Sequence, residues 1–99
     1  EYQNAAHILL PLVQEDHKDT SAGMALAAAY FGQGRIDKAE NILSTVILID
    51  PSIPEAHYNM SHVKLNKKQP DWQAARRHYR KSLELGGSED KTLNSALNP

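Results

Sequence analysis

The chain has 99 residues, which suits one small domain, and its 40% hydrophobic and 6% aromatic residues support a thin layered core rather than a large globular one. A formal net charge of −1 gives no overall field that would favour nucleic acid or an anionic membrane. The absence of cysteine excludes disulfides, thiolate catalysis and cysteine-ligated zinc.

The first expected helix spans residues 1–17, with a kink near residues 7–10, because Pro11 lacks an N–H and its ring clashes with the carbonyl four residues back. Because the chain begins with glutamate, we expect a piece of a longer protein or a processed one, entered at the second helix of a repeat. The preceding helix is then missing, and part of one apolar face lacks its neighbour. That face carries Tyr2, Ala5, Ala6, Leu9, Leu12 and Val13.

Residues 20–51 read as a helical hairpin. Asp19 or Thr20 caps a helix that is rich in small residues and runs to about Phe31. A Gly-Gln-Gly turn at 32–34 leads into a helix over about 35–49, which stops before Pro51 because proline disfavours helical geometry at the residue before it. The apolar face of this second helix carries Ala39, Leu43 and Val46.

Residues 54–87 read as a second hairpin, with one helix over about 54–67 and another from Pro70 to about Leu85, before two glycines. Lys64 falls where the first hairpin has Tyr30, so either its methylene stem covers apolar surface or Val63 takes the core position. The turn that connects these two helices is two residues longer than the turn of the first hairpin. Residues 88–98 then predict a short capping helix whose apolar side carries Leu93, Ala96 and Leu97.

A repeat links these segments. Each of the three second helices has an alanine three residues after a large apolar residue, and these alanines, at 5, 39 and 75, are 34 and then 36 residues apart. One helix-turn-helix per period of about 34 residues indicates a helical solenoid. The residue pairs are Tyr2 and Ala5, Ile36 and Ala39, and Trp72 and Ala75.

The repeat resembles the tetratricopeptide repeat (TPR) family. The matching residues are Leu26, Ala27, Tyr30, Gly34, Ala39 and Pro51. The resemblance implies one all-α domain over residues 1–99, a short right-handed solenoid of antiparallel helical hairpins with about six helices. It also implies a non-catalytic scaffold that binds a partner protein or peptide in the concave groove lined by the first helices. On the matching positions, that groove would contain Met24, Ala28, Phe31, Tyr58, Asn59, His62 and Leu65.

A basic cluster on the last long helix offers a possible patch for an acidic partner. It consists of Arg76, Arg77, Arg80 and Lys81. The alternative is a solvated face whose charges complement the helix C-terminus and pair with Glu84. Nucleic acid is not favoured, because the net charge is slightly negative and no aromatic residues are interleaved with the cations.

No catalytic constellation, phosphate loop or metal-ligand spacing can be traced, so we expect no enzyme activity, cofactor or metal. The five histidines are expected at the surface or half-buried. No apolar run approaches the ~20 residues needed to span a bilayer, and a cytoplasmic or a periplasmic location remains open. The alternative function is self-association, in which two copies form a homodimer by covering their exposed terminal helices.

Overall fold

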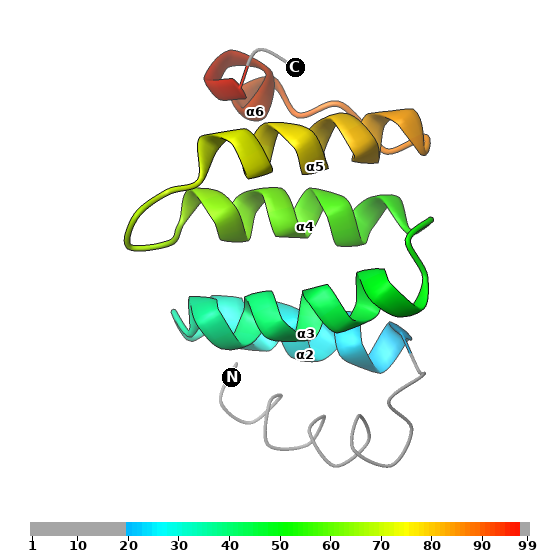
Figure 1. Cartoon of the computed structure of the whole chain (residues 1–99), viewed down its shortest axis with the longest axis vertical. Coiled ribbons are helices and arrows are strands. Elements are labelled where there is room, and N and C mark those ends of the chain that lie inside the picture. The colour runs from blue at the N-terminus through cyan, green and yellow to red at the C-terminus, as the bar shows by residue number, and fades with distance from the viewer. Residues whose placement is uncertain (1–19, 98–99) are drawn as a thin grey trace. The chain divides into compact units, whose positions relative to one another are not determined.

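The computed structural model describes residues 20–97. This part of the chain is all-α and contains no strand (Figure 1). The expected all-α fold is confirmed, whereas the helix expected over residues 1–17 lies outside the described residues. The chain divides into two compact units, Glu1–Pro51 and Ser52–Pro99. The described helices are α2 (Thr20–Gly32), α3 (Ile36–Ile49), α4 (Pro54–Leu65), α5 (Trp72–Glu84) and α6 (Lys91–Leu97).

In the first unit, α2 packs against α3 as a helical hairpin. Small residues on α2 let the two helices approach closely. A Cβ added at Gly23 would lie 2.7 Å from Val46 Cγ2, so this position has room only for glycine unless Val46 moves. The predicted core face of α3 is confirmed, since Ala39, Leu43 and Val46 are all buried.

The turn between α2 and α3 depends on Gly34, whose φ of 78° lies in the left-handed region that other residues rarely adopt. The Arg35 N–H donates to the Tyr30 carbonyl at 2.8 Å and so satisfies a carbonyl at the end of α2. At the other end of the hairpin, α3 stops at Ile49, and the Asp50 N–H donates to the Val46 carbonyl at 2.9 Å. Asp50 has extended geometry, as expected for a residue that precedes proline.

We predict that Ala39→Leu destabilises the protein by about 1–3 kcal/mol, because Ala39 is fully buried and a larger side chain would overpack the contact between α2 and α3. Urea unfolding followed by circular dichroism measures the loss. Ser44→Leu is the matched control, since Ser44 is exposed on the same helix. An Ala39→Leu variant as stable as the control would contradict the assigned register.

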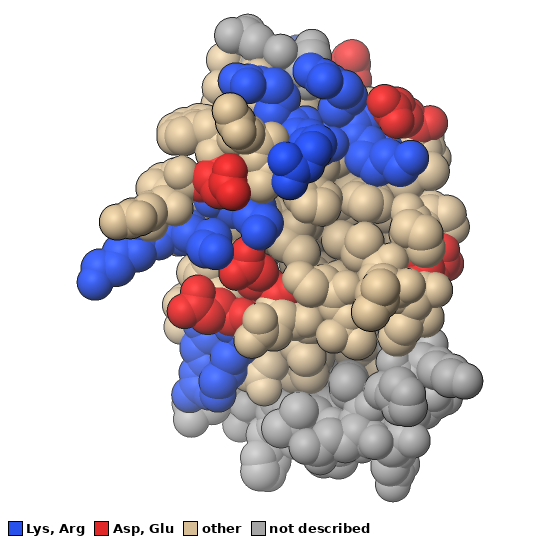
Figure 2. Space-filling view, in the orientation of Figure 1, with Lys and Arg blue, Asp and Glu red and all other residues tan. Residues whose placement is uncertain are grey.

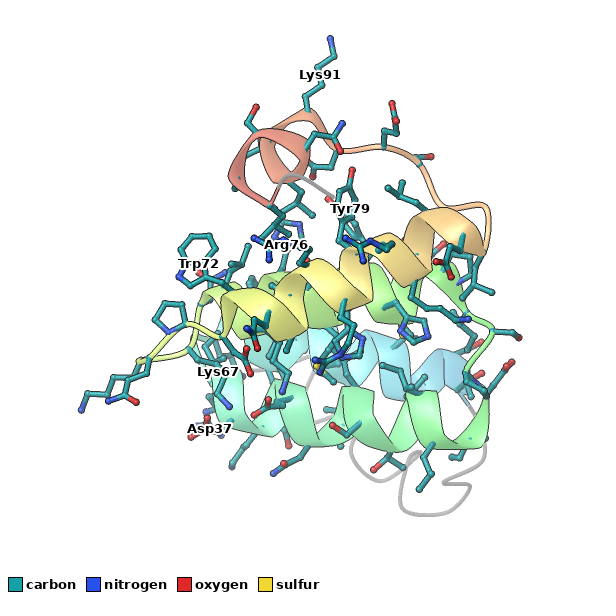
Figure 3. All side chains as sticks on the ribbon, turned by 45° about the horizontal axis from the view of Figure 1, so that its top comes forward. Asp37, Lys67, Trp72, Arg76, Tyr79 and Lys91 are labelled. Atoms are coloured by element: carbon teal, nitrogen blue, oxygen red, sulfur yellow. The ribbon has the colours of Figure 1, made fainter. Side chains whose placement is uncertain are left out.

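In the second unit, α4 packs against α5. The two alternatives for Lys64 are now distinguished, because Val63 is buried and Lys64 is half-buried, so Val63 takes the core position. Ala75, the repeated alanine of α5, is buried, and so are Tyr79 and Ser82 on the same helix. Trp72 differs from this pattern, with 51% of its surface exposed at the start of α5 (Figure 3).

Two helix boundaries in this unit differ from the prediction. The first helix ends at Leu65 rather than Lys67, and the Asn66 side chain donates to the His62 carbonyl at 2.7 Å. The next helix begins at Trp72 rather than Pro70, because the Asp71 carboxylate caps it by accepting from the Ala74 N–H at 3.0 Å.

The last helix, α6, starts at Lys91, three residues later than expected. Asp90 caps it, since the Leu93 N–H donates to the Asp90 carboxylate at 3.1 Å. Leu93 and Leu97 are buried in a cluster with Ala75 and Tyr79 of α5. Three half-buried side chains pack against this cluster: Tyr58, Leu65 and Leu83.

Candidate functional site

The predicted groove residues lie on two first helices that belong to different compact units. On α2, Met24 and Phe31 are half-buried and Ala28 is exposed. Their spacing of four and three residues places them on one face of the helix. On α4, the predicted residues Tyr58, Asn59, His62 and Leu65 are all half-buried and likewise share one side of the helix. Each set can therefore offer part of its surface to a ligand.

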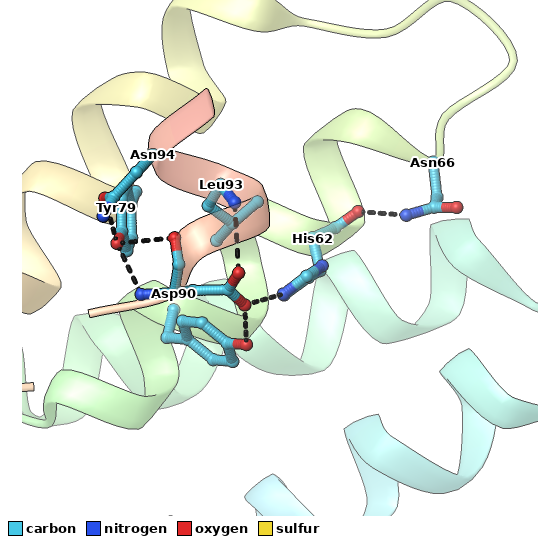
Figure 4. Close-up of polar contacts among 7 residues, drawn as sticks. His62, Asn66, Tyr79, Asp90, Leu93 and Asn94 are labelled. Carbon is cyan, nitrogen blue, oxygen red and sulfur yellow. Dashed lines mark hydrogen bonds and ion pairs between the residues drawn. The ribbon is translucent and has the colours of Figure 1, made fainter. Parts of the chain in front are cut away.

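Two of the α4 residues meet at Asp90 (Figure 4). The Tyr58 hydroxyl donates to Asp90 Oδ2 at 2.6 Å, and His62 Nε2 lies 3.9 Å from the same oxygen. The Tyr58 and His62 rings pack edge to face, with centroids 4.8 Å apart. Tyr58 and His62 therefore already have a polar partner, Asp90, within the second unit.

The hydrogen bond between Tyr58 and Asp90 alters the acidity of both groups. It raises the pKa of Tyr58 to about 12, with burial as the next cause, because ionising the phenol would set a second negative charge beside the carboxylate. The same bond, followed by the Leu93 N–H, lowers the pKa of Asp90. The carboxylate therefore stays ionised and the phenol stays protonated over the ordinary pH range.

Tyr79 holds the other side of the Asp90 segment. Its hydroxyl accepts from the Asp90 N–H at 2.8 Å and donates to Asn94 Oδ1 at 2.6 Å. In Figure 3 its ring extends from α5 toward α6. Sequence reasoning did not single out Asp90, although an acidic residue just before a short helix is a capping signal. No sequence pattern indicated that two tyrosines would bond to it.

A hollow of about 510 Å³ opens beside Tyr58 in the second unit. It is lined by Pro54 and Glu55 at the start of α4, by Tyr58, by Ser82 of α5, and by residues 86–91. A Cβ added at Gly87 would lie 2.5 Å from Ser82 Oγ, so the segment after α5 runs close against that helix. The hollow is large enough to accept a side chain of a bound peptide.

The basic cluster on α5 divides into one structural residue and three exposed ones. Arg76 is half-buried, and its Nε–H donates to the Leu97 carbonyl at 2.7 Å, which satisfies the C-terminus of α6 (Figure 3). Arg77, Arg80 and Lys81 are exposed. Lysine and arginine atoms gather over α5 in Figure 2. Lys81 also lies 3.9 Å from Glu84, so the predicted pairing with that residue is present.

One expectation for the histidines is wrong. His57 is buried, with 6% of its surface exposed, because it stacks on His78 of α5. The two Nδ1 atoms are 3.1 Å apart and the ring centroids 5.4 Å apart. The pKa of His78 is lowered to about 4, mainly by burial and then by the neighbouring charges of His57, Arg77 and Lys64.

Within residues 20–97, no group of three histidine or carboxylate side chains could hold a metal ion. Over the same residues, no helix is both long and apolar enough to cross a membrane.

A sequence model described as tetratricopeptide repeat matches residues 1–65 of the chain. A search of curated proteins found none that matches the chain.

Proposed function

Because the chain belongs to the tetratricopeptide repeat family, we propose that it binds a partner protein or peptide through the first-helix faces of α2 and α4. Members of this family are generally non-enzymatic interaction modules. The observation that carries the proposal is the set of half-buried apolar and polar side chains at the groove positions of both helices. Met24 and Phe31 supply apolar contacts, and Asn59 supplies an amide that can bond to a peptide backbone.

The surface on α4 is suited to an extended peptide. Tyr58 and Leu65 present the apolar area that their packing against the core cluster leaves exposed, and the half-buried Asn59 lies on the same side of the helix. A peptide side chain entering that hollow would meet Glu55, Glu89 and Asp90 together with Lys91. An excess of carboxylates favours a basic or neutral side chain there over an acidic one.

The proposal is tested by affinity capture from a lysate of the source cells, with the double variant Ala28→Arg/Asn59→Arg compared with the wild type. Ala28 is exposed and Asn59 half-buried, and neither takes part in the contacts of Asp90, so the variant is expected to remain folded. Two large cations, one on each proposed face, should reduce recovery of specific partners by about tenfold or more, a loss of roughly 1.4 kcal/mol or more.

The matched control is Ser44→Arg/Gln73→Arg, which adds the same charge at exposed positions of α3 and α5. It should recover the same partners as the wild type. If the groove variant and the control both retain every partner, binding does not use these faces. If each form recovers only the chain itself, self-association replaces partner binding as the function.

A further inference from the structure

A second hollow, of about 350 Å³, opens on the second unit between α4 and α5. Positive side chains dominate its lining, with three cations against one carboxylate. Arg80 and Lys81 follow Arg77 by three and four residues on α5, so both lie on the same side of the helix as Arg77. The residues that line this hollow are His57, Arg77, His78, Arg80, Lys81 and Glu84.

The stacked pair His57 and His78 contributes two rings to the hollow. With their Nδ1 atoms 3.1 Å apart, one ring donates to the other. The pair borders a hollow that is also lined by two guanidinium groups and one ammonium group.

The electrostatic balance of the hollow favours an anion. His57 and Lys64 face His78 from α4, Arg77 faces it from α5, and of the charges acting on it only Asp71, at the start of α5, favours its protonated form. Within the lining, Glu84 opposes three cations and pairs with Lys81 alone, at 3.9 Å. Arg77 and Arg80 therefore have no carboxylate among the lining residues that would offset both of their charges.

We propose that the hollow between α4 and α5 binds a phosphate group carried on a side chain of a partner protein. Two guanidinium groups can each donate two parallel hydrogen bonds to phosphate oxygens, and a phosphorylated side chain brings about −1.5 to −2 charges to match three cations. A single carboxylate would supply only about half to two thirds of that charge. This inference rests on the proposed function in one respect only, that a partner protein carries the phosphate.

The shape of the site decides between possible carriers of the phosphate. The three cations lie within about one and a half turns of one helix. The hollow that they line therefore fits one compact anion. A membrane surface is generally held by a wider cluster of about four to eight basic residues. A nucleic-acid strand is held by a groove with stacked aromatic side chains, and the lining here contains only the two mutually stacked histidines.

The test uses a short uncharged peptide with one central phosphoserine, the same peptide without phosphate, and inorganic phosphate. Binding to the purified chain is followed by NMR, through the ring signals of His57 and His78 and the Nε–H signals of the arginines. The phosphopeptide should shift these signals, and inorganic phosphate should shift the same ones more weakly. The unphosphorylated peptide should leave them unchanged.

The double variant Arg77→Gln/Arg80→Gln should weaken phosphopeptide binding by about tenfold or more, since charge-assisted hydrogen bonds contribute about 1.5–3 kcal/mol. Both arginines are exposed, so the fold should be retained. The control Arg35→Gln/Lys68→Gln removes the same charge at exposed positions outside the hollow. It should bind as the wild type does.

Several outcomes would overturn the proposal. Equal binding of the phosphorylated and unphosphorylated peptides would show that phosphate is not recognised. Equal binding by the wild type and the folded arginine variant would place the site elsewhere. Binding of anionic vesicles or of single-stranded RNA through Arg77 and Arg80, without binding of the phosphopeptide, would assign the hollow to a different ligand. Because the peptide is added to purified protein, these results stand whatever the outcome of the lysate capture.

Discussion

Replacing Tyr79 with alanine is expected to lower the free energy of unfolding by about 3–5 kcal/mol, the largest loss predicted for this chain. Tyr79 is fully buried and lies in one cluster with Leu93 and Leu97, so truncation leaves a cavity between α5 and α6. It also removes the acceptor of the Asp90 N–H and the donor to Asn94. Since small domains are stable by only about 5–15 kcal/mol, much of the margin would be lost.

The conservative variant Tyr79→Phe separates the two contributions. It keeps the ring in the cluster and removes only the hydroxyl, so we expect a smaller loss of about 1–3 kcal/mol from the unpaired Asp90 N–H and Asn94. Urea unfolding followed by far-UV circular dichroism measures both variants. Equal losses for the two variants would show that the ring contributes little by packing. A loss below about 1 kcal/mol for Tyr79→Ala would contradict the assignment of Tyr79 to the core.

Sequence reasoning placed the core well because periodicity depends on local geometry. An alanine three residues after a large apolar residue marked the position of one apolar face on each second helix. The structure buries Ala39, Leu43 and Val46 on α3 and Ala75 and Tyr79 on α5. Helix stops at Pro51 and at the glycines after α5 were predicted for the same reason, since these residues restrict or free the backbone of their own segment.

Periodicity within single helices could not predict which side chains of distant segments contact each other. Tyr58 and Asp90 are 32 residues apart, and His57 and His78 are 21 apart, and each pair meets only because α4, α5 and α6 pack together. Spacing within one helix could indicate that His57 and His62 lie on different sides of α4. It could not show that one of them would be buried against another helix. The last helix was expected to start at residue 88, but α6 starts at Lys91 because Asp90 supplies the cap.

The bonds of Asp90 connect the fold to the proposed binding face. Tyr58 and His62 were predicted as ligand contacts, yet both also approach the carboxylate that caps α6. The short helix is therefore fastened to α4 by the same side chains that would contact a peptide. A ligand on this face would gain from Asn59 and the exposed part of Leu65 without breaking the bonds of Asp90. This is why the binding test changes Asn59 and leaves Tyr58 intact.

The free energy of unfolding should depend on pH through His78, which stacks on the buried His57. The pKa of His78 is lowered to about 4, mainly by burial and then by the charges of His57, Arg77 and Lys64, with Asp71 acting in the opposite direction. In the unfolded chain its pKa is about 6.5. Between these values the unfolded state binds more protons than the folded state, so the free energy of unfolding falls as the pH falls. We expect a loss of about 2–3 kcal/mol between pH 7 and pH 4, at about 1.4 kcal/mol for each unit of pKa difference.

Urea unfolding at a series of pH values in phosphate-free buffers measures this dependence, with His78→Gln as the matched variant. Glutamine does not titrate, so the variant should lose less stability between pH 7 and pH 4 than the wild type, by about the 2–3 kcal/mol assigned to His78. Asp90 acts in a lower window. Its pKa is lowered by the Tyr58 hydroxyl and the Leu93 N–H, so its contribution is present above the unfolded pKa of about 3.9 and is lost only as the pH falls further. Identical slopes for the wild type and His78→Gln above pH 4 would show that folding does not depend on a neutral His78.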